Sequence, residues 1–203
     1  MNKKLLVEFI GTFFLVLTVA LTGDPLAIGG VLIALVYMGG YISGAHYNPA
    51  VTIALLINKK ISNEDAKAYI LTQLIAGIVA SATYLFMTGE RFTPTIARSA
   101  TFATAGVVEI VFTFLLASVV LHTAATDKTK NNQYFGLAIG LALMVGAFAG
   151  GPISGGAFNP AVGVGPLLFD FQNWGAHLPM ILLYLIAPVV GGGLASFVYK
   201  KLQ

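Results

Sequence analysis

The sequence has no cysteine and few charged residues, and both shortages narrow the possible classes of protein. Without cysteine, the chain has no disulfide bonds and no thiolate metal sites. Only 9% of its 203 residues are charged, against about 25% in an ordinary soluble domain, whereas 57% are hydrophobic. The formal net charge of +3 is too small, and its carriers are too scattered, to indicate nucleic-acid binding. This composition is typical of a membrane protein that crosses the bilayer several times.

Side chains that carry chemistry are also scarce. The histidines His46, His122 and His177 are not clustered with Asp or Glu and have no metal-ligand spacing. No nucleophile, base and oxyanion donor stand together in the pattern that catalysis requires. The sequence therefore predicts no metal and no other cofactor, and it argues against an enzyme.

Six apolar runs are long enough to cross about 30 Å of hydrocarbon at about 20 residues each. They cover residues 4–22, 26–43, 66–88, 103–123, 133–151 and 177–199. The first run follows two lysines but has no convincing cleavage site of small residues, so we expect a retained span rather than a secretory signal. Two more apolar segments, Pro49–Ile57 and Pro160–Leu168, are too short to cross. We expect them to enter the membrane as half-helices from opposite sides, because an odd number of spans separates them.

A ten-residue stretch occurs twice in the chain. The first copy is Ile42-Ser43-Gly44-Ala45-His46-Tyr47-Asn48-Pro49-Ala50-Val51, the second is Ile153-Ser154-Gly155-Gly156-Ala157-Phe158-Asn159-Pro160-Ala161-Val162, and seven positions are identical. In each copy Asn is a good N-cap and Pro occupies the first helical position, which predicts the start of a helix. One isolated Asn-Pro pair would indicate an ordinary helix cap. Two copies in inverted halves favour a functional role.

Similarity between the two halves extends beyond this stretch. Residues of the first and fourth spans match at an offset of 101: Glu8, Thr12 and Phe13 with Glu109, Thr113 and Phe114. Residues of the third and sixth spans match at an offset of 115: Gly77, Ala80, Ser81 and Tyr84 with Gly192, Ala195, Ser196 and Tyr199. We therefore predict one transmembrane domain over residues 1–203, with repeat halves at about 1–88 and 103–203. Each half has three spans, so the second is inverted, an architecture of membrane transport proteins.

The basic residues predict the orientation of the chain. With the N-terminus in the cytoplasm, all nine lysines fall on the cytoplasmic side, whereas Arg91 and Arg98 fall outside. These lysines are Lys3, Lys4, Lys59, Lys60, Lys67, Lys128, Lys130, Lys200 and Lys201. The positive-inside rule favours this arrangement, so we expect both termini in the cytoplasm and the protein in a plasma or inner membrane.

The repeated stretch predicts a water-accessible path. Irregular backbone persists at membrane depth only where it is buried or lines a wet cavity. Two inverted half-helices point their N-terminal dipole ends, each about +0.5 charge, at the centre, where they repel cations. Asn48 and Asn159 offer amide donors there. A water molecule that accepts from both interrupts the hydrogen-bonded chain along which protons hop.

Glu8 and Glu109 are the acidic residues within the full spans, where an unpaired carboxylate is costly. One interpretation makes them ion- or proton-coupling groups of a transporter. The other makes them structural acceptors for backbone N–H groups of the repeated loops, and their symmetry with these loops favours this role. His46 is expected to line the cytoplasmic vestibule, with a packing role in the loop as the alternative.

Several of these features occur together in one known family. They are the two Asn-Pro-Ala segments, the paired Glu8 and Glu109, Gln73 in the third span and Gly165-Pro166 after the second motif. In this combination the chain closely resembles the aquaporin, or major intrinsic protein, family, from the first span to the sixth. The resemblance implies an all-α membrane protein with an aquaporin-like, right-handed bundle of six transmembrane helices and two re-entrant half-helices. It also implies a pore in each protomer and a homotetramer in the lipid bilayer.

The resemblance assigns roles to individual residues. Asn48 and Asn159 become the central donors of the pore. The residues that pack the half-helices together are Pro49, Ala50, Pro160 and Ala161. The family's narrow filter usually has an arginine directly after the second motif, and here that position is Val162. The other filter positions fall on Ile28, Ala147 and Gly156, and water-selective members place an aromatic residue and a histidine at the first two.

This filter is expected to be wider and less polar than usual. Any cation barrier then depends more on the half-helix dipoles. We expect water to pass together with small uncharged solutes such as glycerol, urea, ammonia or hydrogen peroxide. Arg98, or else Arg91, is a candidate for folding inward to supply the missing charge, and an exposed loop arginine is the favoured alternative.

Three classes of function are compatible with these features. The leading hypothesis is a passive channel. The second is an ion- or proton-coupled secondary transporter, for which the inverted repeat is equally good evidence. The third is a structural membrane protein with a closed pore. A flux measurement separates them, because a channel needs no ion gradient and depends weakly on temperature.

Overall fold

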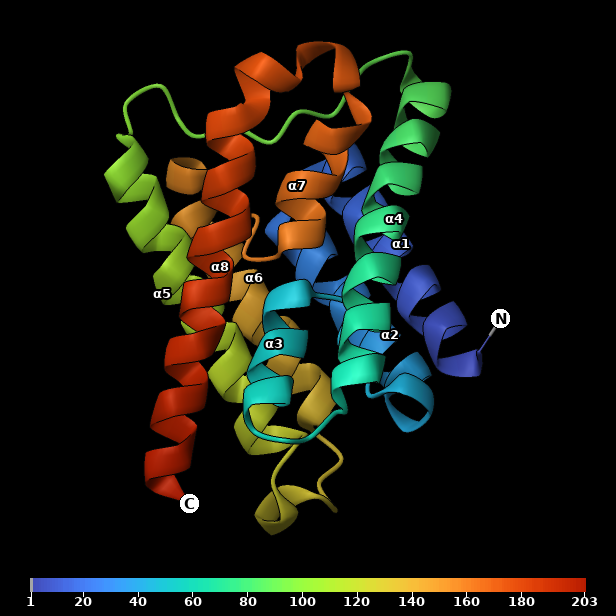
Figure 1. The fold of residues 1–203 in the computed structure, drawn as a ribbon, viewed down its shortest axis with the longest axis vertical. Helices are drawn as coiled ribbons and strands as arrows, with labels where there is room; N and C mark the ends of the chain where they lie inside the picture. The colour runs from blue at the N-terminus through green and yellow to red at the C-terminus, as the bar shows by residue number, and fades with distance from the viewer. Residues whose placement is uncertain (1) are drawn as a thin grey trace.

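The computed structural model describes residues 2–203, which form eight α-helices and two short 3-10 helices (Figure 1). The α-helices are α1 (Lys3–Thr22), α2 (Pro25–Ser43), α3 (Pro49–Ile57), α4 (Asn63–Thr88), α5 (Phe102–Thr123), α6 (Phe135–Ser154), α7 (Pro160–Phe169) and α8 (Trp174–Leu202). The 3-10 helices are η1 (Asp127–Thr129) and η2 (Phe171–Asn173). Six of the helices are long and apolar enough to cross a membrane. The predicted all-α membrane fold is therefore confirmed.

The predicted helix positions agree with the structure, but several predicted ends are wrong. The third span begins at Asn63 rather than 66, because Ser62 Oγ accepts the N–H of Asp65 at 3.0 Å and caps the helix. The fifth covers Phe135–Ser154 rather than 133–151, and the sixth covers Trp174–Leu202 rather than 177–199. At Asn63, hydropathy alone misses the first turn because a capped polar segment continues the helix beyond its apolar run.

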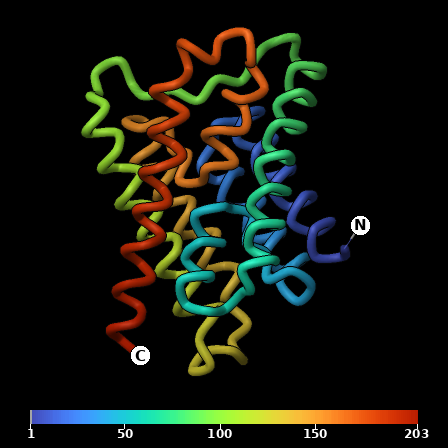
Figure 2. The backbone as a smooth tube through the Cα atoms, in the orientation of Figure 1, coloured from blue at the N-terminus to red at the C-terminus, as the bar shows by residue number. Residues whose placement is uncertain are grey.

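The two half-helices meet in the middle of the bundle. Figures 1 and 2 show α3 below α7, with the N-terminal end of each directed at the other. Asn48 and Asn159 are the N-caps, and each accepts a hydrogen bond from a backbone N–H of the first turn through its side chain. Both helix starts were predicted correctly from the Asn-Pro pattern.

The two ends of the bundle differ in charge. The lower end in Figure 1 contains the turn 58–62 and the connection 124–134, which together include Lys59, Lys60, Lys128 and Lys130. We refer to it as the lysine-rich end. The upper end contains the connection 89–101 and residues 170–173, and we refer to it as the opposite end.

Each half-helix packs on the last long helix of the other half. Helix α3 contacts α8, and α7 contacts α4. Glycine makes this close approach possible, because a Cβ atom at Gly192 would lie 2.7 Å from the Ala50 carbonyl oxygen. A Cβ atom at Gly77 would lie 2.5 Å from the carbonyl oxygen of Ala161. Each half-helix also contacts the long helix of its own half, α3 on α4 and α7 on α8, so both half-helices are held between the two halves.

Candidate functional site

Both copies of the repeated stretch have the same backbone conformation. Gly44 and Gly155 have φ angles of 87° and 84°, and Tyr47 and Phe158 have φ angles of 50° and 47°. Positive φ is unfavourable for a bulky side chain and persists only where surrounding contacts enforce it. The contacts that do so here come from the two buried glutamates.

Glu8 lies on α1 and holds the first loop through both carboxylate oxygens. Its Oε1 accepts from Ser43 Oγ at 2.7 Å and from the His46 N–H at 3.0 Å. Its Oε2 accepts from the Tyr47 N–H at 2.8 Å and from Gln73 Nε2 at 2.8 Å. The Glu8 side chain is fully buried, and each of its oxygens is satisfied twice.

Glu109 lies on α5 and holds the second loop in the same manner. Its Oε1 accepts from Ser154 Oγ at 2.7 Å and from the Ala157 N–H at 3.0 Å, and its Oε2 accepts from the Phe158 N–H at 2.6 Å. This side chain is also fully buried. Both glutamates thus have the geometry of structural acceptors, and neither lines the cavities described below.

The first loop has an additional polar chain that the second loop does not share. Gln73 Nε2 also lies 3.1 Å from Thr52 Oγ1, and Thr52 Oγ1 lies 3.1 Å from His46 Nδ1. The matching residues of the second half are Pro188 and Gly163, which offer no side-chain donor. The sequence identified Gln73 only through the family resemblance and missed Thr52. The sequence could have indicated Thr52, because it is a polar residue one turn into an otherwise apolar half-helix.

The two asparagines join the loops to each other. Asn48 Nδ2 donates to the Phe158 carbonyl oxygen at 2.9 Å, and Asn159 Nδ2 donates to the Tyr47 carbonyl oxygen at 2.9 Å. The Oδ1 atom of each accepts the N–H two residues further along, at 2.8 and 2.9 Å. Since an amide nitrogen carries two hydrogens, each asparagine keeps one hydrogen for a molecule beside it.

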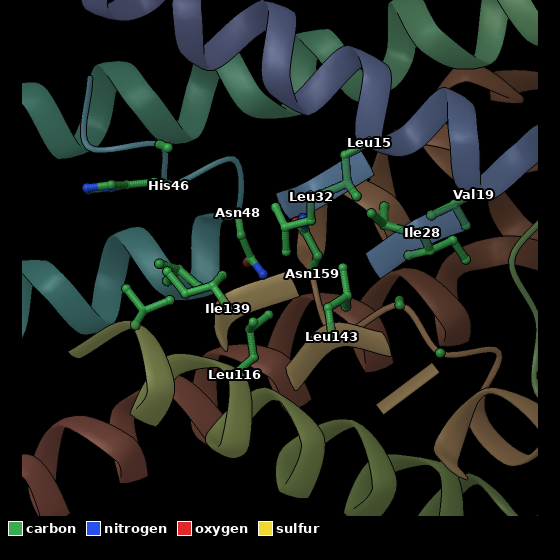
Figure 3. Close-up of a pocket in the computed structure, with 16 residues that line it drawn as sticks. Leu15, Val19, Ile28, Leu32, His46, Asn48, Leu116, Ile139, Leu143 and Asn159 are labelled. Carbon is green, nitrogen blue, oxygen red and sulfur yellow. The ribbon is translucent and has the colours of Figure 1, made fainter. Parts of the chain in front are cut away.

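Both asparagines line a narrow cavity between α1, α2, α5, α6 and the half-helices (Figure 3). Its walls carry ten branched aliphatic side chains: Leu15, Val19, Ile28, Leu32, Val51, Leu116, Val120, Ile139, Leu143 and Val162. In Figure 3, His46 lies toward one end of the cavity, Val19 and Ile28 lie toward the other, and the asparagines lie between them. The volume open to water-sized molecules is about 20 Å³, and one water molecule needs about 10–15 Å³. The open volume is therefore about that of one water molecule, which makes this cavity the narrow part of the path.

Wider vestibules adjoin the narrow cavity at both ends. The vestibule of the opposite end has a volume of about 450 Å³ and shares Val19, Ile28 and Gly156 with the narrow cavity. The lysine-rich end has two adjoining pockets of about 260 Å³ each, and they share His46 or Ala45 with the narrow cavity. The bundle thus contains a path that is wide at both ends and narrow in the middle.

The structure places all four predicted filter residues along the path, two of them where the narrow cavity meets the opposite vestibule. Ile28 and Gly156 line both spaces. Val162 lines the narrow cavity, and Ala147 lines the vestibule. None of the four predicted filter residues has a charged side chain.

The two arginines of the connection 89–101 do not replace the missing charge in this structure. Arg91 Nη1 lies 2.7 Å from Asp170 Oδ1, and its guanidinium group stands 5.9 Å from the centre of the Phe169 ring. Arg98 is exposed. Neither arginine lines the narrow cavity or the opposite vestibule.

Asp170 is a residue that the sequence reasoning missed. Its Oδ2 lies 2.8 Å from His177 Nε2 and accepts from Asn173 Nδ2 at 2.9 Å, in addition to the contact with Arg91. The hydrogen bonds with His177 and Asn173, together with the Arg91 charge, hold the pKa of the Asp170 carboxyl below its ordinary value. This cluster ties the connection 89–101 to the start of α8. The sequence offers no local signal for this cluster, because Arg91 lies 79 positions from Asp170.

Comparisons with known proteins agree with this architecture. Residues 20–199 match the family described as Major intrinsic protein. The chain is 39% identical to "Glycerol uptake facilitator protein-like 6" of Lactiplantibacillus plantarum, over 96% of this chain and 95% of that protein. It is 35% identical to "Nodulin-26" of Glycine max, over 98% of this chain and 77% of that protein.

The fold resembles that of a solved structure as well. The X-ray structure of the aquaglyceroporin from Plasmodium falciparum superposes with a TM-score of 0.82 at 21% sequence identity, covering 98% of this chain and 95% of that chain. Family membership favours a channel over a coupled transporter. The chain therefore belongs to the major intrinsic protein family, as a passive membrane channel for water and small solutes and not as an enzyme.

Proposed function

We propose that the path conducts water together with small uncharged solutes, and that Ile28, Ala147, Gly156 and Val162 form its filter. The observation that carries the proposal is the apolar character of these residues at the junction between the narrow cavity and the opposite vestibule. A polar solute that enters loses hydration and finds few replacement partners on aliphatic walls. Neutral molecules with a modest hydration cost are therefore favoured, and ions are excluded.

Asn48 and Asn159 are the pore centre in this proposal. Each has one N–H that is not used in joining the loops, and both N-terminal ends of the half-helices lie beside them. A passing water or hydroxyl oxygen accepts from these donors, and the two positive dipole ends oppose cations. Pro49, Ala50, Pro160 and Ala161 hold the half-helices against each other and against α4 and α8. Glu8 and Glu109 serve as structural acceptors that keep both loops in place.

We further propose that the lysine-rich end faces the cytoplasm of a plasma or inner membrane, with both termini on that side and His46 in the cytoplasmic vestibule. The positive-inside rule supports this orientation. Residues 1–203 then form one channel domain. Exposed apolar side chains along the long helices support contact with lipid and with neighbouring protomers in a homotetramer. Light scattering of the detergent-solubilised protein tests the tetramer, and a monomeric mass would refute it.

Stopped-flow light scattering on proteoliposomes tests the transport proposal. Water, glycerol, urea, ammonia and hydrogen peroxide are compared with protein-free liposomes of the same lipid, with ion gradients present and absent. We expect rapid water flux, measurable flux of at least one of the other solutes, and no dependence on an ion gradient. Glycerol is the first solute to compare, because the relative from Lactiplantibacillus plantarum is named for its uptake. Rapid water flux without flux of any other solute would refute the wider selectivity.

The Val162→Arg variant locates the filter in the same assay. A long charged side chain at this position fills part of the junction and adds donors. We expect glycerol flux to fall more than water flux. Equal losses for both molecules would place the filter elsewhere along the path.

A further inference from the structure

The walls of the narrow cavity consist of identical residues in pairs, one from each half. The pairs are Leu15 with Leu116, Val19 with Val120, Ile28 with Ile139, Leu32 with Leu143, and Val51 with Val162. The first two pairs are 101 positions apart and the other three are 111 apart, the offsets that also relate the buried glutamates and the two motifs. Because the halves are inverted, each residue near one end of the cavity has a counterpart near the other.

The predicted filter takes part in this pairing. Ile28 and Gly156 line both the narrow cavity and the opposite vestibule. Their counterparts, Ile139 and Ala45, line both the narrow cavity and a vestibule pocket of the lysine-rich end. The boundary between narrow and wide space is therefore built twice from matching positions.

The remaining two filter positions follow the same rule. Val162 and its counterpart Val51 line the narrow cavity and neither vestibule. Ala147 and its counterpart Val36 each line only the vestibule of their own end. All four filter residues thus have an inverted copy at the lysine-rich end.

The two sets differ in side-chain size. Two positions are identical, whereas Val36 stands opposite Ala147 and Ala45 stands opposite Gly156. The neighbouring His46 likewise corresponds to Ala157 and lines the cavity on the same side. Every difference puts the larger side chain at the lysine-rich end. In a close-packed interior this added volume is taken from the open space.

We propose that Val36, Ala45, Val51 and Ile139 form a second constriction, and that it limits the passage of solutes larger than water more than the filter does. The inference deepens the proposed function and rests on it, because the narrow cavity must be the conducting path. The size of a neutral solute is then selected mainly at the lysine-rich end. The filter at the opposite end still differs from the family pattern, because Val162 stands where an arginine is usual.

A matched pair of substitutions tests this inference. Ile139→Ala and Ile28→Ala remove the same atoms from equivalent positions that are 5% and 7% exposed. In proteoliposomes we expect Ile139→Ala to raise the ratio of glycerol to water flux about threefold or more, and Ile28→Ala to change it by less than about 1.5-fold, because the larger of two barriers in series sets the rate. A larger gain for Ile28→Ala, or equal gains, would overturn the proposal.

If either of these alanine variants does not fold, a pair of smaller substitutions at Val36 and Ala147 provides the same test. Val36→Ala gives the lysine-rich end the residue of the opposite end, and Ala147→Val makes the reverse change. The glycerol ratio should rise for Val36→Ala, and Ala147→Val alone should lower it only slightly. If wild-type protein conducts neither water nor glycerol, the proposed function itself fails. If it conducts both and Val36→Ala has no effect, only the second constriction is refuted.

Discussion

The two halves of the molecule support their loops in nearly the same way but present different side chains near the path. Both loops have a serine and two backbone N–H groups bound to a buried glutamate, and both have an aromatic residue at positive φ. The first loop adds Gln73, Thr52 and His46, whereas Pro188, Gly163 and Ala157 stand at these positions in the second half. The contacts that hold the loop backbone are thus the same in both halves. The polar side chains beside the path occur only in the first half.

The largest expected effect separates the two glutamates. Glu109→Gln replaces one carboxylate oxygen with an NH2 group, so at least one of the Ala157 and Phe158 N–H groups loses its acceptor, and a buried unpaired donor costs about 1–3 kcal/mol. We expect Glu109→Gln to destabilise the protein by at least about 2 kcal/mol, and Glu8→Gln by less, because Gln73 can turn its amide oxygen toward the new donor. Thermal unfolding in detergent measures both. A greater loss of stability for Glu8→Gln than for Glu109→Gln would show that Gln73 does not compensate for the lost carboxylate oxygen.

The next effect concerns the half-helices held between the two halves. Gly192→Ala puts a methyl group 2.7 Å from the Ala50 carbonyl oxygen, so α3 must move away from α8. We expect a loss of about 1–3 kcal/mol, the usual cost of overpacking. Gly77→Ala should cost a similar amount, since it meets Ala161 in the same way.

Gly193→Ala is the matched control for this prediction. A Cβ atom at Gly193 has nothing within 4 Å, and alanine is a better helix former than glycine. We expect unchanged or slightly raised thermal stability. If Gly192→Ala were equally harmless, the close approach of α3 and α8 would not be a constraint on the fold.

A smaller effect tests the polar chain that only the first half has. Thr52→Val keeps the side-chain shape but removes the hydroxyl that contacts His46 and Gln73. We expect a loss of about 0.5–1.5 kcal/mol and an altered glycerol flux, because His46 is released beside the cavity. Thr83→Val, which removes a hydroxyl that donates to the Val79 carbonyl oxygen within α4, is the control for losing a hydroxyl away from the cavity. A flux unchanged by Thr52→Val would assign His46 a purely packing role.

The smallest effect concerns stability in acid at the opposite end. There the carboxylate of Asp170, a residue of the second half without an acidic counterpart in the first, binds Arg91 of the connection 89–101. Because the pKa of Asp170 lies below its ordinary value of 3.8, its ionised form stabilises the fold at neutral pH. This contribution is fully present above 3.8 and is lost as the pH falls through the lower, folded-state value. Asp170→Asn should therefore lower the unfolding temperature at neutral pH and reduce its decline in acid. Parallel curves for both proteins would contradict the prediction.

Several features of the fold and of the site were predictable because they depend on neighbouring residues. Asn48 and Asn159 mark helix starts through their own side chains, so Asn-Pro identified both half-helices without a structure. Helix ends were less reliable, as at Asn63, because capping extends a helix beyond its apolar residues. Asp170 escaped notice because its partner Arg91 lies 79 positions away.

The sequence by itself determined the membrane class, the inverted repeat, the two half-helices and the glutamates that accept from their loops. Each of these follows from apolar run length, from capping, or from identity between the halves. Only the tertiary structure decided that each half-helix packs between the two halves, that Arg91 binds Asp170 instead of lining the narrow cavity, and that paired residues build a boundary at both ends of the path. The physical reason is that these are contacts between distant segments, and packing geometry, rather than local propensity, selects among the many partners that an apolar sequence permits.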